Sequence, residues 1–409
     1  MKSILEAATA IEQQIIQDRR NLHREPEIGL KTAKTAEYIL KRLQEMGIDA
    51  KHCGGKVDEK LRENFVFAGF PDMDEATGVV ATVGKGEPCI LLRADMDALP
   101  MPEKSGLDFA SQVPGLAHSC GHDSHAAMLL GAAEILKERE AELKGTVKFI
   151  FQPGEEVGCG SRLMIEDGMM ENPHVDAAFA MHVMPQTDVG TVEYVPGIMS
   201  AAMDTYMVKI QGKGGHSSMP HLAIDPLMIA NQLYTTLNLF SSREIDPRET
   251  VALTVGQCGG GTAANVIPDT AEIMVGTRTF NRDVRNHILK RIPEIVDYTV
   301  KMWRGKYEIA EFHTPSTFTD EKICEELKPT IGKIVGMDNI KAVVPMAGTE
   351  DFGYYTEKVP SMMIWLGAGN KDMPQVHDPA MVLDERVFAT GAAIYAQVAV
   401  DWLEKNKKL

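Results

Sequence analysis

The sequence predicts an α/β protein in which a largely parallel sheet is flanked by helices and a smaller α+β domain is inserted. Two observations predict this fold class. Before residue 199 and after residue 311, short apolar runs alternate with helical segments, as in parallel sheets covered on both faces. Between these positions the order is strand-helix-strand-strand-helix-strand, which is typical of a ferredoxin-like unit. We therefore expect a discontinuous domain, residues 1–198 and 312–409, and an inserted domain, residues 199–311.

The elements of the discontinuous domain follow from hydrophobic periodicity. Ile4, Ala8, Ile11 and Ile15 recur at helical spacing, so residues 3–22 are predicted to form one amphipathic helix. Further helices are predicted at 35–46, 123–140, 159–169, 321–335 and 384–403. Apolar runs predict strands at 88–92, 146–151, 176–180, 342–345 and 361–366. Because ligands of such sheets collect beyond the carboxyl ends of the strands, the loops that follow these runs are candidate sites.

The inserted domain has a different pattern. Tyr206, Val208 and Ile210 alternate with more polar residues, which predicts a half-exposed strand. A helix at 225–240, strands at 250–257 and 270–279, a helix at 282–302 and a strand at 306–312 complete the expected unit.

Composition excludes several classes of function. The net charge of -16 argues against nucleic acid and against anionic membrane surfaces as partners. No apolar run approaches the roughly 20 residues that cross a bilayer. The six cysteines are widely spread, as expected where thiols stay reduced, which indicates a cytoplasmic location. Small molecules and further copies of the chain are the expected partners.

One segment concentrates potential metal ligands. His118-Ser119-Cys120-Gly121-His122-Asp123-Ser124-His125 holds three histidines, a cysteine and an aspartate. Thiolate, imidazole and carboxylate donors together favour a transition metal over Mg²⁺ or Ca²⁺. Further donors, in Gln152-Pro153-Gly154-Glu155-Glu156, Met181-His182-Val183 and His377-Asp378-Pro379, follow separate predicted strands. Their meeting at one sheet edge predicts a metal site, with a polar cleft that binds no metal as the alternative.

Several ordered motifs resemble one family. They are Leu91-Leu92-Arg93-Ala94-Asp95-Met96-Asp97-Ala98-Leu99-Pro100, Cys120-Gly121-His122-Asp123, Gln152-Pro153-Gly154-Glu155-Glu156, Gly214-Gly215-His216-Ser217, Asn265-Val266-Ile267-Pro268 and Gly348-Thr349-Glu350-Asp351-Phe352. Together they closely resemble the metal-dependent amidohydrolases, a group with hippurate hydrolases, N-acyl-amino-acid deacylases and plant auxin-conjugate hydrolases. Aminoacylases and glutamate-releasing carboxypeptidases belong to the wider family. The resemblance covers nearly the whole chain.

The resemblance implies two divalent metal ions per subunit, Mn or Zn in the first place and Ni or Co as further candidates. It implies Cys120 as the bridging ligand and His122, Glu156, His182 and His377 as the others. The wider family has a metal-binding histidine where this chain has Asp95, which leaves the role of Asp95 open. For Asp97 we expect a carboxylate that orients an imidazole ligand.

The expected reaction is hydrolysis of the amide bond of N-acyl amino acids or short peptides. Amide hydrolysis needs an activated water and a proton for the leaving amine, and a carboxylate beside the metals can transfer that proton. The resemblance assigns this role to Glu155. It also implies that residues 1–198 and 312–409 form the metal-binding catalytic domain and residues 199–311 the lid and dimerisation domain. From that domain His216 is expected to reach across a homodimer to the substrate carbonyl, and Asn265 and Arg278 to bind the polar end of the substrate.

Two alternatives to this enzyme remain at this point. One is a non-catalytic, metal-dependent binding protein on the same fold, and the other is a thiol hydrolase that uses Cys120. The roles of His118, His125 and His221 are open. Thr349 or Glu350 either faces the cleft or belongs to a structural turn.

Overall fold

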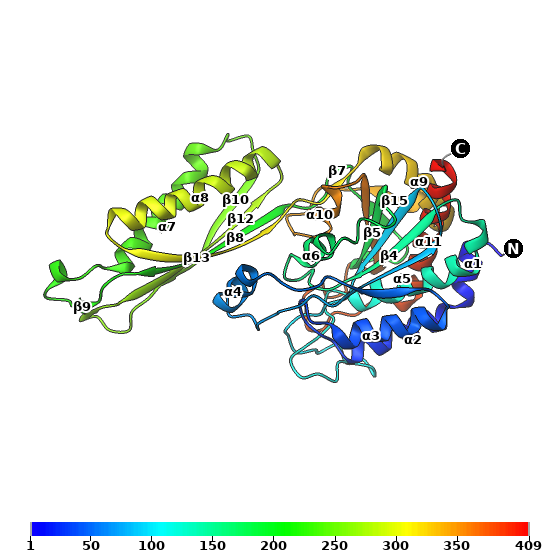
Figure 1. Cartoon of the computed structure of the whole chain (residues 1–409), viewed down its shortest axis with the longest axis horizontal. Coiled ribbons are helices and arrows are strands. Elements are labelled where there is room, and N and C mark those ends of the chain that lie inside the picture. Colours follow the sequence, from blue (N-terminus) through cyan, green and yellow to red (C-terminus); the bar gives the residue numbers. More distant parts are fainter. Residues whose placement is uncertain (1, 408–409) are drawn as a thin grey trace.

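The computed structural model describes residues 2–407 and consists of two lobes. The larger lobe holds both ends of the described chain, and the smaller lobe extends from it on a pair of adjacent strands (Figure 1). The predicted combination of a mostly parallel sheet with an inserted α+β unit is confirmed.

The larger lobe is built on an eight-stranded sheet with the order β1-β2-β4-β3-β5-β16-β6-β15. Its four central strands, β4, β3, β5 and β16, are parallel to one another, so their carboxyl ends lie at one edge. The strands are β1 (Ala50–Cys53), β2 (Gly78–Gly84), β3 (Cys89–Asp95), β4 (Thr146–Gln152), β5 (Ala177–Asp188), β6 (Val192–Tyr194), β15 (Ile340–Ala342) and β16 (Ser361–Gly369).

Helices cover both faces of this sheet. They are α1 (Ile4–Ala10), α2 (Glu12–Arg24), α3 (Ala33–Glu45), α4 (Glu59–Phe67), α5 (His122–Glu138), α6 (Gly160–Glu166), α9 (Glu321–Val335), α10 (Gly353–Thr356) and α11 (Phe388–Asn406). One large apolar core joins α1, α2, α3, α5, α9 and α11 to alternate strand residues, and a second core on the opposite face includes residues of α6 and α10. The two faces explain why the strand segments are apolar without alternation.

Three local predictions differ from the structure. The predicted helix 3–22 is two helices that meet at Ile11, whose backbone is not helical. The strand expected at 342–345 is instead β15 at Ile340–Ala342. The strands β1, β2 and β6 and the helix α4 were not predicted. Of these, β1 lies at the sheet edge and buries little apolar surface.

The smaller lobe, here called the lid, has a four-stranded antiparallel sheet with the order β10-β12-β8-β13. Its elements are β8 (Ala202–Gln211), α7 (Pro226–Glu244), β10 (Val251–Gly259), β12 (Thr270–Thr279), α8 (Arg282–Met302) and β13 (Lys306–Thr314). This order confirms the predicted ferredoxin-like arrangement. Tyr206, Leu233 and Ile292 belong to a core that the lid forms from its own residues. The boundaries at 199 and 311 remain our proposal for the division of the chain.

The lid has two further features that bear on function. β8 and β13 are neighbouring strands, with Met203 opposite Thr314, so both connections to the larger lobe run side by side. At the outer end, β9 (Gly215–His216) pairs with β11 (Val266–Ile267) (Figure 1). Within residues 2–407, no helix combines the length and the apolar composition needed to cross a membrane.

Candidate metal centre and active site

The predicted metal ligands come together at the carboxyl ends of the central strands. Cys120 and His122 stand at the beginning of α5, Glu156 follows β4, His182 lies in β5, and His377 follows β16. Cys120, Glu156, His182 and His377 line a cavity of about 500 Å³. Sheet topology therefore gathers donors from four separate segments of the chain.

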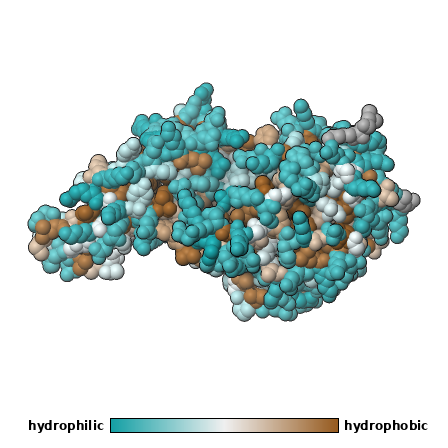
Figure 2. All heavy atoms as spheres, in the orientation of Figure 1, coloured by the Kyte–Doolittle hydropathy of each residue, from teal (hydrophilic) through white to brown (hydrophobic). Residues whose placement is uncertain are grey.

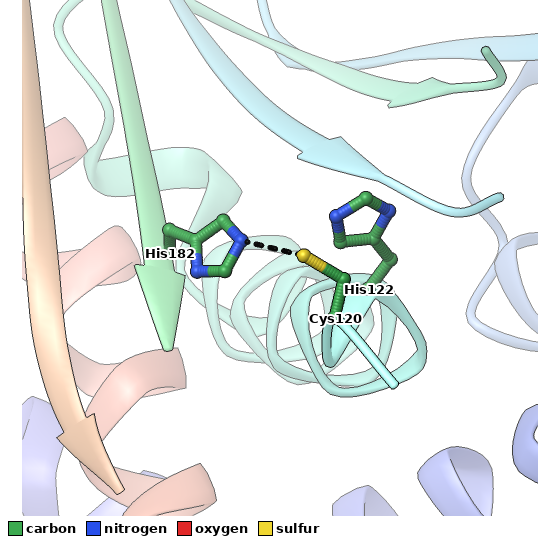
Figure 3. Close-up of side chains that lie close together, drawn as sticks. All are labelled: Cys120, His122 and His182. Atoms are coloured by element: carbon green, nitrogen blue, oxygen red, sulfur yellow. Dashed lines mark hydrogen bonds between the residues drawn. The ribbon is translucent and has the colours of Figure 1, made fainter. Parts of the chain in front are cut away.

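Gly121 allows the two donors of the Cys120 segment to share one site. It has φ of 89°, and a Cβ atom at this position would lie 2.5 Å from the side chain of Val183. A residue with a side chain would be strained here by both its backbone conformation and this contact. The glycine is the N-cap of α5, and the sulfur of Cys120 points toward His182 of β5 while the imidazole of His122 lies nearby (Figure 3).

The donors form two groups that share one sulfur atom. Ligand atoms of Cys120, His122 and His182 lie within 4.8 Å of one another, and so do those of Cys120, Glu156 and His377. Sγ of Cys120 is 3.3 Å from Nε2 of His182 (Figure 3). Each group combines the sulfur with nitrogen or oxygen donors, a set of ligands that suits a divalent transition metal.

Backbone carbonyls fix the tautomers of the two buried imidazoles. Nδ1 of His122 donates to the carbonyl oxygen of Asp97 at 2.9 Å, and Nδ1 of His182 donates to that of Val183 at 2.7 Å. Each Nε2 therefore carries a lone pair directed into the site. Nε2 of His122 and Oε1 of Glu156 are buried without a hydrogen-bond partner. Because orphaned buried polar atoms are costly, these donors fit a bound cation.

His377 reaches the site from a strained loop. Its φ is 65°, a conformation that residues other than glycine rarely adopt. Its backbone N–H donates to the carbonyl oxygen of Ser119 at 2.7 Å, and its Nε2 lies 3.3 Å from Oε1 of Glu156. The strain is thus located where the loop meets the donor cluster, as is common at functional sites.

Asp97 organises two neighbours of the site through different atoms. Its carbonyl oxygen accepts from His122, whereas its carboxylate accepts the backbone N–H groups of Glu155 at 3.0 Å and of Glu156 at 3.2 Å. The carboxylate oxygen is 3.6 Å from Nδ1 of His122. The side chain therefore positions the pair of glutamates, and the main chain orients the imidazole.

Asp95 and His125 form a buried pair behind the donors. Nδ1 of His125 donates to Asp95 at 2.5 Å, while Nε2 of His125 accepts the N–H of Val183 at 2.9 Å. Both ring nitrogens are used, so His125 has no lone pair to offer a metal. The pair supports β5 next to His182. Asp95 thus has a structural role as the hydrogen-bond partner of His125, and this role does not require Asp95 to bind a metal.

The other two histidines with open roles lie apart from the donors. His118 is buried near His23, and burial lowers its pKa to about 3. His221 is exposed on the lid, outside the cavity.

Glu155 faces the cavity within a cluster of acids. Its carboxylate lies within 4.8 Å of those of Glu350 and Asp351, and the positive charge of Arg93 in β3 attracts all three. Burial, together with the neighbouring Glu350 and Glu156, raises the pKa of Glu155. Burial likewise raises the pKa of Glu350 to about 7. A buried carboxylate with a raised pKa at the edge of a cavity is suited to proton transfer.

Arg93 is the buried cation of this cluster and was not predicted as a site residue. Its guanidinium contacts Asp95 at 2.6 Å and both Glu350 and Asp351 at 2.9 Å. It also donates to Gln152 at 2.9 Å. The only sequence signal was its place in the first motif, because its acidic partners in the Glu350 turn lie more than 250 residues away.

Comparison with known proteins places the chain among characterised hydrolases. The model of peptidase family M20/M25/M40 matches residues 91–401. The chain belongs to this family. An N-acetyl-L-cysteine deacetylase of Bacillus subtilis is 36% identical over 98% of this chain and 91% of its own length. An IAA-amino acid hydrolase of Arabidopsis thaliana is 35% identical over 95% of this chain and 86% of its own length.

A solved structure supports the same assignment. A dinuclear metal binding peptidase of the M20 family from Bacillus subtilis matches with a TM-score of 0.73 and 31% identity, over 97% of this chain and 99% of that chain. The resemblance stated from the motifs is confirmed, and with it the class of enzyme, a hydrolase of amide or peptide bonds. The donor groups of this chain are suited to divalent metal ions, in agreement with the dinuclear metal binding neighbour.

The three predicted site residues of the lid lie in two different places. Arg278 of β12 lines the cavity and donates a hydrogen bond to Thr349 of the larger lobe. His216 and Asn265 lie together at the outer end of the lid, where the N–H of Ser217 donates to the carbonyl of Asn265 at 3.2 Å. Within one chain, the structure brings Arg278 to the site and leaves His216 and Asn265 away from it (Figure 1).

Proposed function

We propose that the protein hydrolyses the amide bond of N-acyl amino acids or short peptides with two divalent metal ions. The observation that carries this proposal is the pair of donor groups joined at Cys120, with the carboxylate of Glu155 beside them. The names of the relatives agree, since one is a deacetylase of an N-acetyl amino acid and another hydrolyses conjugates of amino acids.

We propose Cys120, His122 and His182 for one ion and Cys120, Glu156 and His377 for the other. The mixture of sulfur, nitrogen and oxygen donors favours Mn or Zn, with Ni and Co as further candidates. When bound, the ions would polarise the substrate carbonyl and lower the pKa of the attacking water.

The side chains of the protein would perform the remaining steps. Glu155 takes a proton from the attacking water and passes it to the nitrogen of the leaving amine. Once protonated, this nitrogen can depart as a neutral amine. Arg278 holds the free carboxylate of the substrate with paired hydrogen bonds, and so places the scissile bond between the donors and Glu155.

Metal removal is the first test of this proposal. Enzyme treated with a chelator and then dialysed is expected to lose cleavage of N-acetyl and N-benzoyl amino acids, measured as amine release. Adding Mn or Zn is expected to restore it, because binding of the donors to a cation is reversible. A thiol hydrolase would remain active after chelation. Restored metal content without cleavage of any substrate would favour the non-catalytic binding protein.

We further propose that the enzyme works as a homodimer in the cytoplasm. His216 and Asn265 lie far from the cavity of their own chain, so they reach a substrate only in another subunit. Met219, Leu222 and Val266 are exposed near them, in a region where hydrophobic residues gather on the lid surface (Figure 2). The six free cysteines of the chain suit a reducing compartment.

Subunit complementation tests the dimer. His216→Ala and Glu155→Gln are each expected to be inactive alone. When they are mixed and allowed to exchange subunits, each heterodimer regains one complete site, so about one quarter of the wild-type activity is expected. A mixture as inactive as its components, with heterodimers demonstrated by mass spectrometry, would show that His216 does not act across the interface.

A further inference from the structure

An apolar wall lines one side of the cavity, and the proposed proton transfer does not use it. The wall consists of Met184 in β5 and of Met363 and Trp365 in β16. Trp365 is the register partner of His182 in the neighbouring strand. Met184 lies two residues after His182, and Met363 lies two residues before Trp365, so all of these side chains lie on one face of the sheet.

The wall is therefore next to the donor cluster. Neighbouring strands are about 4.8 Å apart, so the backbone of Trp365 lies beside that of the donor residue His182. Trp365 and Met363 are buried and belong to the core on this face, while Met184 is half-buried. The wall is thus held by the sheet and does not depend on the position of the lid.

The cationic end of the cavity lies on the lid. Arg278 of β12 is the cross-strand partner of Met203 in β8, and both line the cavity. A substrate carboxylate bound by Arg278 would place the α-carbon and its side chain beside Met203. The scissile carbonyl would lie at the donors, and the acyl group would continue past them along the sheet.

We infer that Met184, Met363 and Trp365 form the subsite for the acyl group and select an aromatic acyl group over acetyl. This inference rests on the proposed function. Aromatic rings pack favourably on an indole and against thioether sulfur, and unbranched methionines adapt to the shape of the ring. The cavity of about 500 Å³ is in the range of pockets that enclose ligands of this size. An acetyl group would leave the wall uncovered.

The test compares acyl groups on one amino acid with metal-loaded enzyme. For the wild type, kcat/KM is expected to be at least about tenfold higher for the N-benzoyl than for the N-acetyl derivative, since a pocket discriminates by tenfold or more for small apolar differences. Met184→Trp fills the subsite and is expected to lower this ratio at least about tenfold, with cleavage of the acetyl derivative retained.

Two further variants keep the test decisive. Met203→Trp is the matched control: it is expected to change the preference for the amino acid and to leave the benzoyl-to-acetyl ratio within about threefold of the wild type. If Met184→Trp does not fold, as judged by circular dichroism, Trp365→Phe shortens the wall and is expected to shift the preference toward the larger N-naphthoyl group.

The outcomes separate this inference from the proposed function. Preferential cleavage of N-acetyl substrates by the wild type would overturn the acyl subsite and leave the amide hydrolase intact. Equal loss of both acyl series in Met184→Trp, or a change in amino-acid preference there, would also overturn it. Failure to cleave any acylated amino acid with metals bound would overturn the proposed function itself.

Discussion

Replacing Glu155 by glutamine is expected to lower kcat by about 10²–10⁴-fold, the usual contribution of a general acid or base, with the metal content unchanged. The variant keeps the shape of the side chain and its backbone hydrogen bond to Asp97. It removes only the ability to accept a proton. Steady-state kinetics of amine release, together with metal analysis of the same sample, measures both quantities.

The neighbouring glutamate provides the matched control. Glu156→Gln makes the same chemical change at a donor whose Oε1 has no hydrogen-bond partner. It is expected to lower metal content as well as kcat, because a neutral amide is a weaker ligand than a carboxylate. If Glu155→Gln kept kcat within tenfold of the wild type at full metal loading, the proposed proton transfer would be wrong.

Replacing Arg93 by methionine is expected to lower the free energy of unfolding by roughly 3–5 kcal/mol, the cost of removing one partner from a buried ion pair. Arg93 is fully buried and is the counter-charge of Asp95, Glu350 and Asp351. Methionine fills similar space, so the loss would reflect charge more than packing. Urea unfolding of the metal-loaded enzyme measures the effect.

An exposed arginine is the control for this experiment. Arg62 pairs with Asp72 at 2.6 Å on the surface, where both side chains are largely solvated. Arg62→Met is expected to lower the free energy of unfolding far less than Arg93→Met, because exposed ion pairs contribute little to stability. If Arg93→Met fails to fold, Arg93→Lys keeps the charge but loses the planar fork, and an intermediate loss is expected. A cost for Arg93→Met no larger than that for Arg62→Met would contradict the assignment.

The fold was predictable because its signals are local or periodic. Unbroken apolar runs identified the central strands of the sheet, and the element order identified the lid. The break at Ile11 was not visible, since Ile11 continues the apolar stripe and the residues on either side of it are helical. The edge strand β1 was missed because it is short and mostly exposed.

The donor cluster was also predictable, because each donor follows a recognisable strand or motif. The acid cluster was not, because the link from Arg93 to Glu350 and Asp351 joins two segments far apart in the chain, and no local pattern encodes it. For the same reason, the sequence did not reveal that Met184, Met363 and Trp365 share a wall: their positions become adjacent only through the register of β5 and β16.

The separate apolar core of the lid has a consequence for how the chain melts. The buried residues of that core lie between Tyr206 and Val300, and none belongs to the cores of the larger lobe. We therefore expect each lobe to unfold as a cooperative unit with its own transition temperature. Calorimetry would resolve two endotherms, and loss of Arg93 would displace the one that belongs to the larger lobe.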